Sequence, residues 1–295
     1  MALHGWIILD KPVGIGSTQC VSAVKRALRE AGEPKTKVGH GGTLDPLASG
    51  VLPIALGEAT KLAGRMLDAT KAYEFIIRFG AQTDTLDAEG QIVATSEFRP
   101  STKQLSDILP RFTGPIEQIP PAFSALKIDG KPAYARARAG EALEMKPRRV
   151  TIHDLRMVES DEASATLAAT VSKGTYIRSL ARDIAEALGT VGHVAMLRRT
   201  RAGPFALESA ISLDKLAEIA KARTLDGAVL PLLAGLDDIP ALPVSPDQAM
   251  LLRHGQLLTG NPAKPGLYLA TDAERPVALV EVSAGDVRVV RGFNL

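Results

Sequence analysis

The sequence predicts an α+β fold in which a small β-rich domain follows a larger one. Stretches with strand-like alternation and stretches with helical spacing are mixed along the chain, without the regular strand–helix–strand order of a doubly wound sheet. At 295 residues the chain is longer than one typical domain. A Pro-containing acidic segment at 237–243 interrupts both periodicities. We therefore predict domains over 1–238 and 239–295.

The elements of the larger domain follow from the spacing of apolar residues. Apolar runs or alternation predict strands at 6–9, 51–56, 73–79, 149–158, 163–172 and 194–200. Helical spacing predicts a helix that Ser17 or Thr18 caps and that continues to Gly32. Further helices are predicted at 101–109, 133–147, 175–188 and 213–233. Residues 114–132, rich in Pro and Gly, are predicted to be loop and sheet edge, and the acidic turn at 84–90 a solvated hairpin.

The smaller domain has weaker signals. A short helix is predicted around 248–253, and strands are predicted at 267–270, 277–282 and 287–291. Its five Lys and Arg residues balance five acidic residues, so any contact with a nucleic acid must come from their placement.

Composition points to a globular protein without a membrane span or a metal. Hydrophobic residues make up 45% and charged residues 23%, and no apolar run is long enough to cross a bilayer. The N-terminus lacks the pattern of a signal peptide, so a cytoplasmic location is expected. The single Cys20 is expected to pack in the core. Five histidines and this cysteine form no metal-ligand spacing, and no dinucleotide or phosphate loop is present.

Positive charge is concentrated in two stretches although the net charge is only +2. Residues 127–149 contain seven Lys and Arg against three acids, and residues 173–201 contain six against two. Such stretches are often solvated faces, but two of them in a nearly neutral protein indicate a surface for phosphate groups.

The most informative stretch is GHGGTLDPLASG at 39–50, which places one carboxylate on a tight turn. Three glycines within four positions allow backbone conformations closed to other residues and let a ligand approach closely. Pro46 disfavours the helical conformation for Asp45. An ordinary Gly/Asp/Pro turn is the alternative interpretation of this composition.

With its context, this motif resembles the catalytic motif of the TruB family of pseudouridine synthases, which modify uridine 55 of tRNA. Five further blocks occur in the order found in that family: LDKPVG at 9–14, KAY at 71–73, PPAFSALK at 120–127, SKGTYIR at 172–178 and LRR at 197–199. The resemblance covers about residues 5–235. Gly41 and Phe123 depart from it, since Thr or Ala and Tyr are expected there.

The resemblance implies a mixed, mostly antiparallel sheet in the catalytic domain and a PUA-like RNA-binding domain at the C-terminus. It implies that Asp45 is the nucleophile, that Arg178 forms an ion pair with it, and that Tyr73 stacks on the target base. By itself, Tyr73 could equally be an ordinary aromatic residue of a sheet.

Three further residues match substrate-binding positions of the family. Tyr176 and Leu197 match positions that line the uracil pocket, and His40 matches a histidine that contacts RNA near the flipped nucleotide. Each also has an ordinary alternative role: Tyr176 could begin a helix, Leu197 could belong to a core strand, and His40 could cap a turn. Phosphate contacts are expected from Lys61, Arg136, Arg138, Arg198 and Arg199.

The implied reaction is isomerisation of the T-loop uridine of tRNA after the base is extruded into a pocket. It requires neither a cofactor nor a metal. The expected partner is tRNA, bound by a monomer without an obligate protein partner. A non-catalytic tRNA-binding factor on the same scaffold is the alternative. The sequence leaves open whether Asp45 attacks C1′, attacks C6 or assists elimination.

Overall fold

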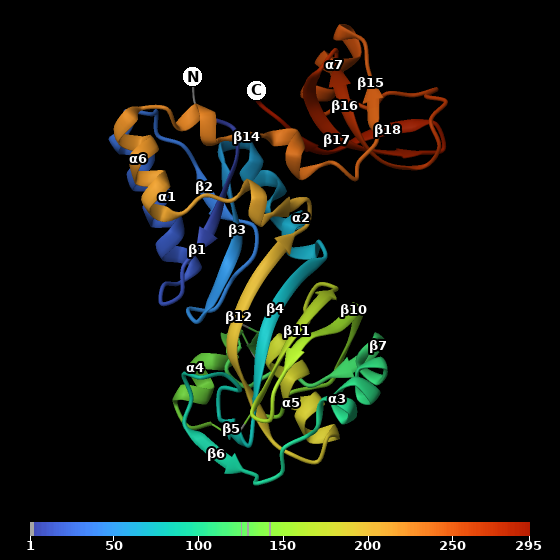
Figure 1. Cartoon of the computed structure of the whole chain (residues 1–295). Helices are drawn as coiled ribbons and strands as arrows, with labels where there is room; N and C mark the ends of the chain where they lie inside the picture. Colours follow the sequence, from blue (N-terminus) through green and yellow to red (C-terminus); the bar gives the residue numbers. More distant parts are fainter. Residues whose placement is uncertain (1–2, 125, 129, 142) are drawn as a thin grey trace.

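The computed structural model describes residues 3–295 except 125, 129 and 142, and a ten-stranded sheet forms its centre (Figure 1). The strands are ordered β14-β1-β3-β12-β4-β11-β10-β7, while β2 pairs with β3 and β13 with β12. Strands β3 and β12 run parallel, and the other described pairs of this sheet are antiparallel. The predicted α+β class with a mostly antiparallel sheet is therefore confirmed.

All six strands predicted for the larger part of the chain are present. They are β1 (Gly5–Lys11), β3 (Ala48–Leu56), β4 (Lys71–Phe79), β10 (Arg148–Ser160), β11 (Ser164–Val171) and β12 (Gly192–Ala202). Shorter strands complete this sheet: β2 (Val38–His40), β7 (Gly114–Gln118), β13 (Phe205–Ala206) and β14 (Leu230–Pro231). Two small hairpins lie outside it: β5 (Ala81–Thr83) with β6 (Ile92–Thr95), and β8 (Lys127–Ile128) with β9 (Lys131–Pro132). Apolar runs and alternation of apolar with polar residues thus predicted the long strands correctly.

The predicted helices match the structure at their starts better than at their ends. The helices observed here are α1 (Ser17–Glu30), α2 (Ala63–Asp68), α3 (Thr102–Ile108), α4 (Ala133–Arg138), α5 (Ile177–Ala187) and α6 (Leu213–Ala222), of which α2 was not predicted. The predicted helices at 133–147 and 213–233 are too long. Gly140, at φ 77°, follows α4, and Arg223, at φ 56°, ends α6 in the left-handed conformation. The rest of 213–233 forms two 3₁₀ turns and strand β14, which extends the sheet beside β1.

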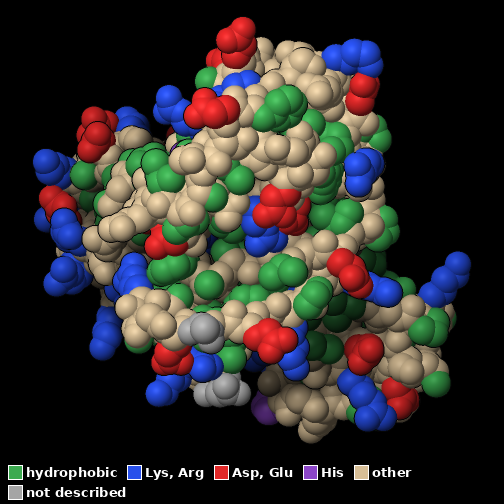
Figure 2. Space-filling view, turned by 90° about the horizontal axis from the view of Figure 1, so that it is seen from below, with side chains coloured by type: hydrophobic (Ala, Val, Ile, Leu, Met, Phe, Trp, Pro, Cys, Tyr) green, Lys and Arg blue, Asp and Glu red, His purple; other side chains and the backbone are tan. Residues whose placement is uncertain are grey.

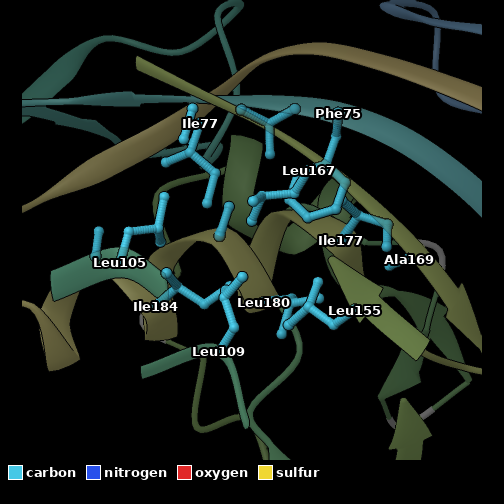
Figure 3. Close-up of a cluster of buried hydrophobic side chains, with 14 of the residues drawn as sticks. Phe75, Ile77, Leu105, Leu109, Leu155, Leu167, Ala169, Ile177, Leu180 and Ile184 are labelled. Carbon is cyan, nitrogen blue, oxygen red and sulfur yellow. The ribbon is translucent and has the colours of Figure 1, made fainter. Parts of the chain in front are cut away.

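Helices cover the sheet and create its cores. Figure 3 shows Leu180 and Ile184 of α5 and Leu105 of α3 pointing toward Phe75, Ile77 and Leu167 on the strands. A second cluster joins α1 and α6 to β1 and β3, and it contains Cys20, as predicted. Full burial of each large apolar side chain contributes about 1.5–3 kcal/mol, so these clusters hold the strands that carry the site.

A separate four-stranded sheet follows the main one. Its elements are β15 (Ala241–Pro243), α7 (Pro246–Arg253), β16 (Gly266–Asp272), β17 (Arg275–Ser283) and β18 (Asp286–Gly292). The predicted helix and three strands are present, but β15 lies in the segment predicted to be a linker, where it pairs in parallel with β16. Leu269, Leu279 and Phe293 of this part pack in the cluster of Trp6, so the two sheets are in contact. None of the helices in the described residues has the length and hydrophobicity of a membrane span.

Candidate active site

The loop that carries Asp45 connects β2 to β3 and is fastened from several sides. The buried ammonium group of Lys11 donates to the carbonyl oxygen of Pro46 at 3.3 Å, and the Gly14 amide donates to the same oxygen at 2.8 Å. Ser17, predicted as a helix cap, instead exchanges two hydrogen bonds with the backbone of Leu44. The LDKPVG block at 9–14 and the start of α1 therefore hold the loop.

Arg199, predicted as a phosphate contact, holds the other side of this loop. Its side chain is 1% exposed, and its guanidinium donates to the carbonyl oxygens of Val51 (2.7 Å), Gly42 (3.2 Å) and Thr43 (3.3 Å). These carbonyls tie the guanidinium to the loop, and contact of Arg199 with a phosphate stays a prediction.

The predicted ion pair between Asp45 and Arg178 is present. A carboxylate oxygen of Asp45 lies 2.9 Å from Nη2 of Arg178, which is 6% exposed, and the Asp45 side chain is 45% exposed. The first turn of α5 carries Arg178, and its guanidinium also donates to the carbonyls of Thr85 (2.9 Å) and Phe123 (3.0 Å). Asp45 is thus held at one side while its other side faces solvent.

A second carboxylate, which the sequence analysis missed, completes this arrangement. Asp87 is 6% exposed, and its carboxylate lies 3.3 Å from Nη1 of Arg178. Thr85 donates to it at 2.6 Å, and so does the Glu89 amide at 3.1 Å. The turn at 84–90 was predicted to be solvated, and for Asp87 this was wrong. Acidic composition indicated exposure, and only folding brings this turn to α5.

Asp45 and Arg178 lie at the wall of a cavity of about 300 Å³, into which several loops and strands converge. Tyr73 of β4, Leu197 of β12 and Tyr176 just before α5, three of the residues predicted to bind the substrate, line it. Sheet pairing explains the convergence, because Leu197 lies opposite Ala48 of β3 and Phe75 of β4. A cavity of this shape can hold one planar base between an aromatic ring and an aliphatic side chain.

Tyr176 is fixed by two residues that the sequence analysis did not select. The buried Gln118 side chain accepts from the amide of Tyr176 at 2.8 Å and donates to its carbonyl at 3.1 Å. The guanidinium of Arg148 covers the ring, with its central carbon 4.8 Å from the ring centroid. A lone Gln in an edge segment and an Arg in a basic stretch carry no sequence signal for such roles.

A second hollow, about 330 Å³, adjoins the first at Asp45 and is lined by His40, Ser124 and Arg138 among others. Burial, with the charge of Arg199 as a second cause, lowers the pKa of His40, so the imidazole is neutral at pH 7. Nδ1 of His40 and Oγ of Ser124 are buried without a hydrogen-bond partner in the described part of the chain. The hydrogen-bonding capacity of both atoms is thus unused by the described residues.

The other predicted phosphate contacts lie at the surface with partners of their own. Lys61 pairs with Glu58 (2.7 Å) and donates to the carbonyl of Gly292 (2.9 Å), which joins the 3₁₀ turn after β3 to β18. Arg198 pairs with Asp10 (2.8 Å), Arg136 pairs with Glu141 (2.6 Å), and Arg138 lies over the ring of Tyr134. Figure 2 shows Lys and Arg side chains interspersed with Asp and Glu over one face. Phosphate contact by these four residues stays a prediction.

The two departures from the family pattern have different structural consequences. A Cβ atom at Gly41 would lie 2.7 Å from Cβ of Met66, so this chain fills with Met66 the space that Thr or Ala would use. Phe123 contributes its carbonyl oxygen to Arg178, a contact independent of the side chain.

Lys71 lines the cavity with an unusually acidic ammonium group. Burial, together with the charge of Arg199, lowers its pKa from 10.5 to about 8. The side chain is 8% exposed, and Nζ donates to the carbonyls of Leu67 (2.5 Å) and Ala69 (2.6 Å). Lys71 thereby anchors the end of α2 to the first residue of β4.

This lowered pKa predicts a pH dependence of folding stability. Between pH 8 and 10.5 the unfolded chain binds more protons at Lys71 than the folded chain, so stability rises with pH in that window. From pH 7.5 to 9.5, wild type should gain about 2 kcal/mol in free energy of unfolding relative to Lys71→Met. Urea denaturation at both pH values measures this, and exposed Lys103→Met should keep the wild-type dependence. Equal pH dependence of wild type and Lys71→Met would contradict the burial effect.

Among the described residues, no group of three or more His, Cys, Asp or Glu could hold a metal ion. The cavity groups thus comprise one half-exposed carboxylate, several cations, two aromatic rings and aliphatic walls. Such a set can bind a polar planar ligand and present a nucleophile or charge partner to it.

Comparisons with known proteins agree with this geometry. A family model described as "TruB family pseudouridylate synthase (N terminal domain)" matches residues 25–177, and one described as "tRNA pseudouridylate synthase B C-terminal domain" matches 178–237. Proteins named tRNA pseudouridine synthase B from Zymomonas mobilis and Novosphingobium aromaticivorans are each 61% identical to this chain. The alignments cover 99% of this chain and 97% and 98% of those proteins.

A solved structure of an H/ACA RNP bound to a substrate RNA containing 2′-deoxyuridine includes a similar chain. It is 26% identical, with a TM-score of 0.75 over 99% of this chain and 86% of that one. Structural similarity over both sheets and high identity to curated proteins lead to the same assignment. The chain belongs to the TruB family of pseudouridylate synthases.

Proposed function

We propose that this protein isomerises uridine to pseudouridine in tRNA and that its target is the uridine at position 55 in the T-loop. One observation carries the proposal: the Asp45 carboxylate, held 2.9 Å from buried Arg178, borders a cavity that Tyr73 and Leu197 line. Family membership and the names of the relatives support the choice of tRNA. The target position comes from the resemblance of the motif at 39–50.

The chemistry requires a carboxylate and a pocket for the base. The bond between C1′ and N1 of uridine breaks, a bond between C1′ and C5 forms, C5 loses its proton and N1 gains one. This is an isomerisation without net oxidation or reduction. Asp45 supplies the group that either bonds covalently to the nucleotide or stabilises its cleavage. Arg178 positions that carboxylate, and Tyr73 holds the base by stacking.

The base must leave the tRNA stack to reach this cavity, at a cost of a few kcal/mol. His40 and Ser124 line the hollow that adjoins the cavity at Asp45, and this position suits contact with the RNA around the extruded base. The part at 239–295, with its own sheet, serves as a PUA-like RNA-binding domain in this proposal. The protein acts as a monomer in the cytoplasm, without an obligate protein partner.

Release of tritium tests the proposed function. We expect incubation with a tRNA transcript tritiated at uracil C5 to release tritium equivalent to one uridine per tRNA, because C5 exchanges its hydrogen for the sugar. A matched transcript with cytidine in place of the T-loop uridine should release none. Release of tritium from another uridine would contradict the target position, and tRNA binding without any release would favour the non-catalytic binding factor.

A further inference from the structure

The cations that line the 300 Å³ cavity differ in whether carboxylates or backbone carbonyls of the protein already pair with them. Its cations are Lys71, Arg148, Arg178 and Arg199. Two carboxylates pair with Arg178, and backbone carbonyls accept from Lys71 and Arg199. The remaining cation, Arg148, has no carboxylate partner in the part of the chain that the structure describes.

Arg148 is held in place without having its donors used up. One terminal nitrogen donates to the carbonyl of Gly174, and the guanidinium carbon lies over the ring of Tyr176. Nε is buried and has no partner among the described residues. Nη1 donates to no described residue, so its N–H groups remain for a ligand beside the ring. Partial burial of a cation without an anionic partner raises the free energy of the folded protein, and a bound anion would offset this.

We infer that Arg148 binds a backbone phosphate of the extruded nucleotide, and this rests on the proposed function. A nucleotide that places its base beside Tyr73 and Leu197 carries its only negative charges on the flanking phosphates. Arginine is suited to such an anion, because two parallel N–H groups can bind two phosphate oxygens. Tyr176 then has two roles, because it lines the base pocket and its ring also supports the guanidinium that binds the phosphate.

The experiment pairs a change in the protein with a change in the RNA. The substrate is full-length tRNA assembled by ligation, tritiated at C5 of the T-loop uridine, with an uncharged methylphosphonate at its 5′ or its 3′ linkage. We expect Arg148→Gln to lower kcat/KM about tenfold on normal tRNA, and one of the methylphosphonates to lower it similarly for wild type. Combining the two should lower it no further than either alone, because they remove one shared contact.

Two controls separate this role from a structural one. Arg156→Gln makes the same charge change at an exposed position of β10 and should leave kcat/KM and the methylphosphonate effect unchanged. The slope of log kcat/KM against log salt should become shallower by roughly one for Arg148→Gln. If Arg148→Gln unfolds, Arg148→Lys, which keeps the charge but not the planar fork, replaces it and should show a partial loss.

Different results overturn the inference and the proposed function. If Arg148→Gln loses activity but keeps the wild-type salt slope and the full methylphosphonate effect, the guanidinium only positions Tyr176 and the inference is wrong. Unchanged activity of Arg148→Gln has the same meaning. If the wild type itself releases no tritium from normal tRNA, the proposed function fails instead.

Discussion

Asp45→Asn should abolish tritium release from tRNA while leaving the protein folded. The amide has the size of the carboxylate but cannot act as an anionic nucleophile or stabilise positive charge on the sugar. We expect the rate to fall by about 10⁴-fold or more, which corresponds to about 5.5 kcal/mol of transition-state stabilisation. Because the Asp45 side chain is half-exposed, the free energy of unfolding should change little.

Single-turnover tritium release with excess enzyme measures the loss, and tRNA binding by the same variant shows that substrate still enters. Arg178 keeps Asp87 and two carbonyl acceptors in this variant, so the site should stay assembled. Asp107→Asn changes an exposed carboxylate on α3 in the same way and should match wild type. A rate for Asp45→Asn above about one-hundredth of wild type would exclude Asp45 as the essential group.

Arg178→Gln should damage stability and activity together. Removing this cation leaves Asp87, whose side chain is 9% exposed, without its charge partner, which costs about 3 kcal/mol in free energy of unfolding. It also frees Asp45 from its position, so we expect tritium release to fall at least about 100-fold. Urea denaturation and single-turnover release measure the two effects separately.

The double variant Arg178→Gln with Asp87→Asn distinguishes the two effects. Neutralising the stranded carboxylate should restore much of the stability and none of the activity, because only the electrostatic penalty is removed. Lys103→Gln, at an exposed ion pair of α3, should leave both readouts near wild type. Equal stability of Arg178→Gln and wild type would show that Asp87 is solvated in solution, contrary to its burial.

Prediction from sequence succeeded where the signal is local. Alternation identified the long strands because each buries one face or both, and Gly-rich composition with Pro46 marked the Asp45 loop. Helix ends were less accurate. The apolar pattern of 213–233 continues past Arg223, but an apolar segment can be buried beside β1 either as a helix or as a strand. After α6, part of this segment forms strand β14, which pairs with β1. Local preference alone does not decide between those packings.

The limit of prediction from sequence is clearest for the charged residues. By itself the sequence determined the six long strands in their order and singled out Asp45 with its motif, because periodicity and turn chemistry act between near neighbours. Only the tertiary structure decided that Asp87 meets Arg178, that Arg199 is buried under the loop, and that Arg148 is left without an anion. The physical reason is that the energy of a charge depends on its solvation and on partners distant in sequence, which folding brings together.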